Sequence, residues 1–171
     1  IHGLLVDGDI LYVSGWFNNI GGVAAADQVA AYTISTGAWS ALGSGLPYYF
    51  FQGFYNMVKV GGDIYMVGNY LQSGYRGVAV WDGTTLSALG TLGSVYDAVV
   101  DADGNIVFVG LFTNGMGIAD ADRIIKYDPI KHKWSAMGNS TITDDIYTMA
   151  RSGDDIYVGG AFTSSDGNGL N

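Results

Sequence analysis

One short acidic stretch holds the side chains best suited to binding a metal ion. Asp101, Asp103 and Asn105 place oxygen atoms at alternate positions just before and after Gly104, as the first half of a calcium-binding loop does. The second half lacks its acid, because the twelfth position is Phe112. A plain hairpin turn is therefore the favoured interpretation and calcium at these three residues the alternative. No other cofactor is indicated.

The most unusual segment is a run of four aromatic residues after Pro47. In a strand these side chains alternate between faces, so some are exposed unless a neighbouring element covers them. Such a patch suits sugar stacking or contact with a protein partner, and the alternative is packing over an adjacent unit. Together with aromatic and amide residues of neighbouring loops, the predicted contact surface comprises Trp16, Asn19, Tyr48, Tyr49, Phe50, Phe51 and Tyr75.

Residue types argue against an enzyme. The chain has no Cys, which removes thiolate chemistry and Cys-ligated zinc. Its two histidines, His2 and His132, lie at different positions of the repeat described below, so a catalytic triad is not expected. Asp97 is the one acid in a predicted innermost strand, whereas glycoside hydrolysis needs a pair of carboxylates.

The net charge of the chain limits the classes of partner that it can bind. The net charge is −9, with only 7 Lys and Arg residues, which disfavours nucleic acid and anionic membrane surfaces. No run of 18 apolar residues that could insert in a membrane is present. These properties fit an extracellular or cell-surface protein that binds a protein or a glycan, or that associates with itself.

The candidate residues above lie in a sequence unit that is repeated along the chain, and the strands of this unit must position them. Each unit begins with a short strand, a Gly/Asp turn and a second strand that ends on Gly. A third strand with Tyr or Trp and a fourth strand reading Trp/Leu-Ser-Ala-apolar-Gly follow, and the closing glycines Gly43, Gly90 and Gly138 are 47 and 48 residues apart. Four short strands in such a period are typical of a β-propeller blade. The prediction is an all-β chain of about 3.5 four-stranded blades, with units at approximately 1–46, 47–93, 94–142 and 143–171 (a half blade).

Predicted first strands are 3–6, 55–60, 96–100 and 147–150, predicted third strands centre on 30–32, 79–81 and 125–127, and predicted fourth strands are 39–43, 86–90 and 134–138. No convincing helix is expected, since the 23–26 region is too short.

Two features of the repeat are typical of a known family: Tyr127-Asp128-Pro129 followed by Trp134, and the strand-ending glycines Gly15, Gly68, Gly110 and Gly159-Gly160. With these features the pattern resembles kelch-type propellers, in particular the central domain of galactose-oxidase-like proteins, and the repeats of fungal cortical polarity markers. The chain departs from the pattern in keeping a Gly-Gly doublet only at Gly159-Gly160.

The resemblance implies six or seven blades with the first strand of each nearest the axis. Leu4, Asn56, Asp97 and Thr148 would then lie near the central channel. The loops after the second and fourth strands would share one face, where propellers commonly bind. The copper site of galactose oxidase needs a Cys-crosslinked Tyr and is not carried over, so copper oxidase activity is rejected for this segment.

Three and a half units cannot close a ring, and two copies would not complete their blades. We therefore expect part of a six- to eight-bladed propeller that serves as a non-enzymatic binding or assembly module of an exported or surface protein. The alternatives are a fragment of a carbohydrate-active propeller enzyme whose other blades supply the acids, and a subunit of an extracellular filament or viral appendage.

Overall fold

The computed structural model describes residues 1–45, 53–69, 77–137, 142 and 144–162. These residues form three four-stranded antiparallel sheets and one two-stranded sheet, each with its strands in chain order. The first sheet contains β1 (Gly3–Asp7), β2 (Ile10–Ser14), β3 (Val29–Thr33) and β4 (Ala38–Ala41). The second contains β5 (Phe54–Val60), β6 (Asp63–Gly68), β7 (Gly77–Trp81) and β8 (Leu86–Thr91). The third contains β9 (Ser94–Val100), β10 (Ile106–Leu111), β11 (Ile124–Asp128) and β12 (Lys133–Ala136). The fourth contains β13 (Ile146–Ser152) and β14 (Asp155–Gly160).

The predicted strands are confirmed, with small changes at their ends. β4 and β12 end at Ala41 and Ala136, two residues before the predicted glycines. Gly43 instead lies in a turn with φ 58°. Within the described residues the helical structure is limited to two 3₁₀ turns, η1 (Ile20–Gly22) and η2 (Gly115–Gly117), and no helix there is long and apolar enough to cross a membrane.

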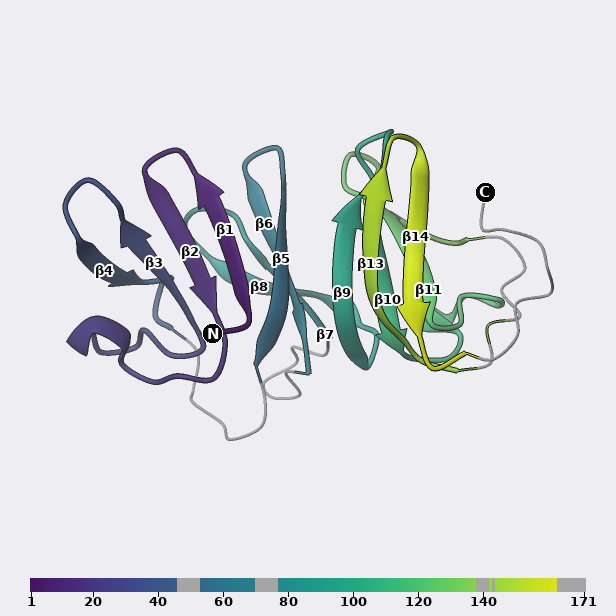
Figure 1. Cartoon of the computed structure of the whole chain (residues 1–171), viewed down its shortest axis with the longest axis horizontal. Coiled ribbons are helices and arrows are strands. Elements are labelled where there is room, and N and C mark those ends of the chain that lie inside the picture. Colours follow the sequence, from purple (N-terminus) through teal and green to yellow (C-terminus); the bar gives the residue numbers. More distant parts are fainter. Residues whose placement is uncertain (46–52, 70–76, 138–141, 143, 163–171) are drawn as a thin grey trace.

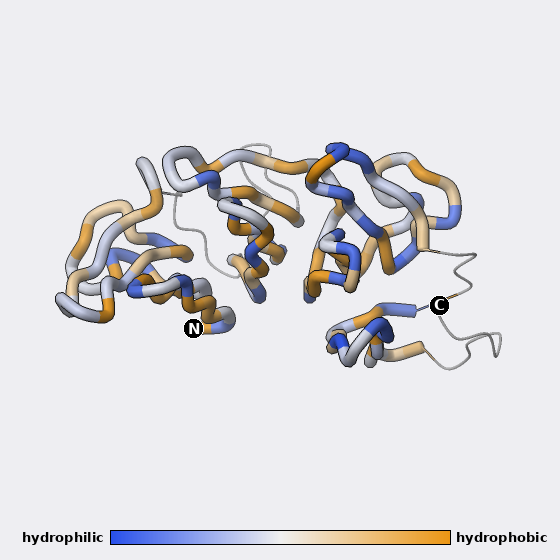
Figure 2. Tube along the Cα trace, turned by 90° about the horizontal axis from the view of Figure 1, so that it is seen from above, coloured by the Kyte–Doolittle hydropathy of each residue, from blue (hydrophilic) through white to orange (hydrophobic). Residues whose placement is uncertain are grey.

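The first strands of the four sheets lie next to one another. Figure 1 shows β1, β5, β9 and β13 upright and in sequence order, and β5 contacts β1 on one side and β9 on the other. The outer strands of each sheet extend away from this row, and from above the sheets follow one another in chain order (Figure 2). This is the arrangement expected of neighbouring propeller blades, and the sheets formed by the described residues do not close into a ring.

Consecutive sheets pack face to face. Met66 is buried in a cluster with residues of the first sheet, whereas its neighbour Tyr65 is buried in a cluster with residues of the third. Phe108 and Val107 divide in the same way between the second and fourth sheets. Successive side chains of a strand point to opposite faces, so a strand buried on both faces reads as a continuous apolar run, as in Ile64–Val67.

Burial also affects the ionisation of the Tyr65 phenol. Tyr65 is 4% exposed and its ring centroid lies 6.2 Å from that of Tyr127 in the third sheet. Loss of hydration, with smaller contributions from Asp63 and Tyr127, raises the pKa of Tyr65 to about 12. The phenol proton therefore reports on the contact between the second and third sheets.

Candidate functional site

Three of the four innermost strands contain a β-bulge at the same place. In each of these strands one tyrosine has no partner in the second strand of the sheet: Tyr55 in β5, Tyr96 in β9 and Tyr147 in β13. A bulged residue has no partner in the ladder and its side chain is re-aimed. Each bulge lies beside a glycine at or next to the end of the second strand: a Cβ at Gly68 would lie 2.0 Å from the carbonyl oxygen of Gly53, and one at Gly110 would lie 2.2 Å from that of Ser94.

These bulges align three tyrosine rings, and a histidine ring continues the series. The ring centroids of Tyr55 and Tyr96 are 6.4 Å apart, and those of Tyr96 and Tyr147 are 5.8 Å apart. His2, directly before β1, occupies the equivalent position of the first sheet, and its ring is 5.8 Å from that of Tyr55. We call His2, Tyr55, Tyr96 and Tyr147 the aromatic row.

Trp16 extends the aromatic row at the end formed by the first sheet. Its ring lies 5.0 Å from that of His2 in an edge-on arrangement, and 45% of the residue is exposed. At the other end Tyr147 is 53% exposed. Tyr55 and Tyr96 between them are half-buried, and burial raises the pKa of both phenols.

Polar groups border the aromatic row. Asn69 hydrogen-bonds to the Tyr55 phenol, and the Ser94 hydroxyl donates to Asn69 Oδ1 at 3.1 Å. Near Tyr96, Arg123 Nε and Asp145 Oδ1 form an ion pair at 3.4 Å. Besides burial, the charge of Asp145 raises the pKa of Tyr96 and that of Arg123 lowers it. Amide, hydroxyl and charged groups thus lie around the rings.

Asp97 lies beside the aromatic row, and hydrogen bonds from neighbouring strands hold its carboxylate in place. Its Oδ1 accepts hydrogen bonds from the Asn56 side-chain amide and from the backbone N–H of Ala98. Its Oδ2 accepts from Thr148 Oγ1 at 3.0 Å and from the backbone N–H of Met149 at 2.8 Å. A buried carboxylate engaged by four donors joins β5, β9 and β13 and is poorly placed to act as a general acid or base.

Leu4 does not share this position, contrary to the sequence prediction. Gly3 pairs with Ser14, the residue before Gly15, just as Asn56 pairs with Val67, the residue before Gly68. Gly3 is therefore the first-sheet equivalent of Asn56, Asp97 and Thr148, and Leu4 points to the other face. The prediction was wrong by one residue because strand composition alone does not show where a bulge shifts the register.

The loops that follow β2 and β10 have the same conformation. In the loop after β2, Asn19 has φ 46° and its backbone N–H donates to Asp27 Oδ1 at 2.7 Å. After β10, Asn114 has φ 47° and its backbone N–H donates to Asp122 Oδ1 at 2.6 Å. Asn tolerates this left-handed conformation, so the predicted contact residue Asn19 also shapes its loop.

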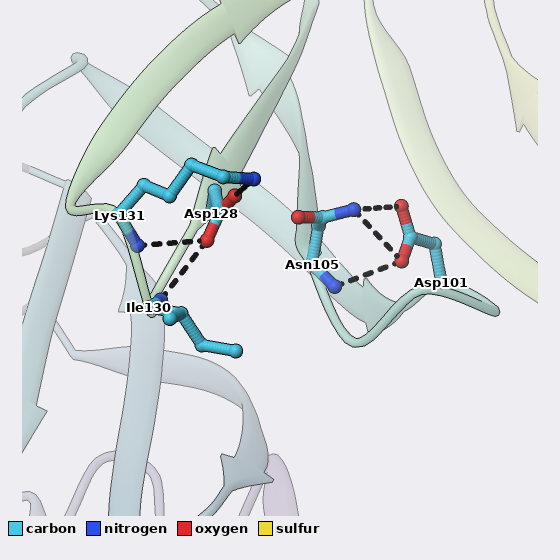
Figure 3. A network of polar contacts seen from close by, with 5 residues as sticks. All are labelled: Asp101, Asn105, Asp128, Ile130 and Lys131. Atoms are coloured by element: carbon cyan, nitrogen blue, oxygen red, sulfur yellow. Dashed lines mark hydrogen bonds and ion pairs between the residues drawn. The ribbon is translucent and has the colours of Figure 1, made fainter.

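The predicted metal ligands lie in a turn closed by hydrogen bonds, and Figure 3 shows those between Asp101 and Asn105. Asp101 Oδ1 accepts from the backbone N–H groups of Asp103 and Asn105 at 3.0 and 2.8 Å, and Asp101 Oδ2 accepts from Asn105 Nδ2 at 2.9 Å. The Asn105 amide thus presents its nitrogen, not its oxygen, to Asp101. Within the described residues no group of three or more His, Cys, Asp or Glu residues is arranged to hold a metal ion. Calcium binding here stays a prediction.

Of the other predicted contact residues, Tyr48, Tyr49, Phe50, Phe51 and Tyr75 lie outside the described residues. The aromatic row itself was not predicted as a site, although the sequence carries its signal. Three of the four predicted first strands begin with Tyr followed by a polar residue, namely Tyr55-Asn56, Tyr96-Asp97 and Tyr147-Thr148.

Comparison with known proteins shows likeness in fold only. The sequence matches no protein-family model and no curated protein. Among solved structures, the extracellular domain of a hybrid two-component system of B. thetaiotaomicron aligns with a TM-score of 0.55 and 12% identity, over 90% of this chain and 18% of that one. A fungal alcohol oxidase of the AA5 family in complex with copper aligns with a TM-score of 0.43 and 18% identity, over 75% of this chain and 28% of that one. The chain thus spans less than a third of the length of either protein.

Proposed function

We propose that this chain is a non-enzymatic binding module of an exported or cell-surface protein, and that it forms part of a propeller with six to eight such sheets. The order of strands within each sheet and the adjacency of the four innermost strands support the propeller assignment. The likeness to an extracellular domain supports the fold. The engagement of Asp97 by four donors supports binding over hydrolysis.

The aromatic row is the observation on which the proposal rests, and the ligand is a carbohydrate. A pyranose ring has an apolar face of C–H groups and a rim of hydroxyl groups. Tyr and Trp rings offer large, rigid surfaces for the former, and here Asn69, Ser94 and the Arg123–Asp145 pair offer hydrogen-bonding groups for the latter. A series of rings at similar separations suits a polymer of similar units better than a single small molecule.

Calorimetric titration with cellohexaose, xylohexaose and mannohexaose tests this proposal. The wild-type chain should bind at least one of them, and Tyr147→Ala should weaken that binding by about tenfold, which corresponds to about 1.4 kcal/mol. Tyr147 is more than half exposed, so its removal should leave the fold intact.

Tyr157→Ala is the matched control. Tyr157 is an exposed tyrosine of the adjacent strand β14 and does not belong to the aromatic row. The proposal fails if the wild-type chain binds none of the three sugars at millimolar concentration, or if the two variants lose affinity equally.

A further inference from the structure

The first and fourth sheets each have a face that none of the other described sheets covers. On the first sheet this face exposes Ile1, Leu4 and Val6, which are 61%, 62% and 64% exposed; we call it the leading face. On the fourth sheet it exposes Thr148, Ala150 and Tyr157, of which Tyr157 is 60% exposed; we call it the trailing face. Exposed large apolar side chains grouped in this way mark interaction surfaces.

The leading face is built like faces that are buried elsewhere in the chain. Leu4 follows Gly3 as Met57 follows Asn56. Leu4 pairs with Val13 and Met57 with Met66, at equivalent positions of the second strands of their sheets. Ile1 precedes His2 as Phe54 precedes Tyr55. Met57 and Phe54 are buried at 4% and 1% exposure in the cluster between the first and second sheets.

The trailing face carries the complementary half of the same kind of contact. Tyr157 pairs with Ala150 as Tyr65 pairs with Val58, and each lies three residues before the strand-ending glycine. Tyr65 is buried against the third sheet, next to Tyr127. In the first sheet the position equivalent to Tyr127 is Tyr32, on the leading face, where its ring lies 4.9 Å from that of Trp39.

We infer that the trailing face of one copy of this chain packs against the leading face of a second copy, head to tail. The contact continues one that the chain already forms internally three times, between each pair of consecutive sheets. The residues named above on both faces are uncharged, and the nearest charged residue of the trailing face is the exposed Asp155, two residues before Tyr157 in β14. This inference does not depend on the proposed function.

The widths of the two faces also agree. Within the described residues the trailing face is two strands wide. On the leading face the exposed apolar residues are Leu4 and Val6 of β1 and Ile1, which lies two residues before β1. Val13 and Ala30 on the same face are buried. A two-stranded sheet is therefore wide enough to cover the uncovered part. Because the contact joins different surfaces, it leads to a ring if the rotation closes and to an open polymer if it does not.

Sedimentation velocity across a range of protein concentrations tests the inference. The wild-type mass should rise with concentration from 18.0 kDa to at least about twice that value. Leu4→Asp and Tyr157→Asp, which each block one face, should both remain monomeric. An equimolar mixture of these two variants should form a 1:1 dimer, because each retains the face that the other lacks.

Ile130→Asp is the control. Ile130 is an exposed apolar residue in the turn between β11 and β12, away from both faces, and this variant should associate like the wild type. Circular dichroism checks that all variants are folded. A wild-type chain that stays monomeric at high concentration overturns the inference and leaves further repeats of a longer polypeptide, or an unrelated protein, as the cover of these faces. If Tyr157→Asp still associates while Leu4→Asp does not, the leading faces pair symmetrically and the head-to-tail arrangement is wrong.

Discussion

At the scale of single residues, Asp97 shows the difference between a residue type and its role. The sequence singles it out as the acid in a predicted innermost strand, which raises the question of catalysis. Only the structure shows that donors from three different strands occupy both of its oxygens. Two of those donors are backbone N–H groups, for which no sequence pattern exists. The sequence could therefore predict the position of Asp97 but not its partners.

Asp97→Ala should destabilise the chain by about 2–4 kcal/mol, because the buried donors that face the carboxylate lose their acceptor. Urea denaturation followed by circular dichroism measures the change. The control is Asp103→Ala, since Asp103 is an exposed residue of a turn and should lie within about 0.5 kcal/mol of the wild type. Equal stability of Asp97→Ala and the wild type would show that the network contributes little.

At the scale of elements, strands and turns could be predicted because both patterns are local. Apolar β-branched and aromatic runs identify the strands, and Gly and Asp identify the hairpin turns. Asp82 and Asp128, for example, accept backbone N–H bonds in the turns before β8 and β12. The pKa of Asp82 is lowered mainly by the backbone N–H of Thr85, and the pKa of Asp128 mainly by the Lys131 side chain, with the Lys131 backbone N–H second. The bulges at Tyr55, Tyr96 and Tyr147 could not be predicted with equal ease. They depend on the close approach of two strands, so the aromatic row was missed although its residues were inside predicted strands.

Gly110→Ala should test the cause of the bulge in β9. A Cβ there would lie 2.2 Å from the Ser94 carbonyl oxygen and 2.8 Å from Val95 Cα, so backbone must move. We expect a loss of about 1–3 kcal/mol, measured by urea denaturation. Gly62→Ala is the matched control, because a Cβ at Gly62 meets no atom within 4 Å and φ is not positive there. A Gly110→Ala chain as stable as the Gly62→Ala chain would mean that the strands can separate without cost.

At the scale of the whole molecule, the repeat predicts consecutive four-stranded sheets, and the structure confirms three of them and half of a fourth. The alternation of buried faces along strands such as Ile64–Val67 explains why these sheets must stack on both sides. The number of sheets in the complete assembly is not encoded in any single unit, since each sheet contacts only its neighbours.

Alkaline pH should loosen the contact between the second and third sheets. In the folded chain the pKa of Tyr65 is about 12, against 10.0 for an unburied phenol. The unfolded chain therefore loses this proton first, so the contribution of Tyr65 to stability should be constant below pH 10 and fall as the pH rises from 10 towards 12. Tyr65→Phe should reduce the slope of this fall, which urea denaturation at several pH values measures. An unchanged slope would assign the fall to the other buried tyrosines.

The bridge through Asp97 also makes the sheets cooperate. The Asp97 carboxylate accepts hydrogen bonds from β5 and β13 at once. Detaching the fourth sheet would therefore remove half of the donors to this carboxylate, and the link between the third sheet and the second would weaken. Local opening should then spread from sheet to sheet instead of remaining confined to one edge. In native-state hydrogen exchange, the amide protons of Ala98 and Met149 should accordingly be released in the same opening event, although they belong to different sheets.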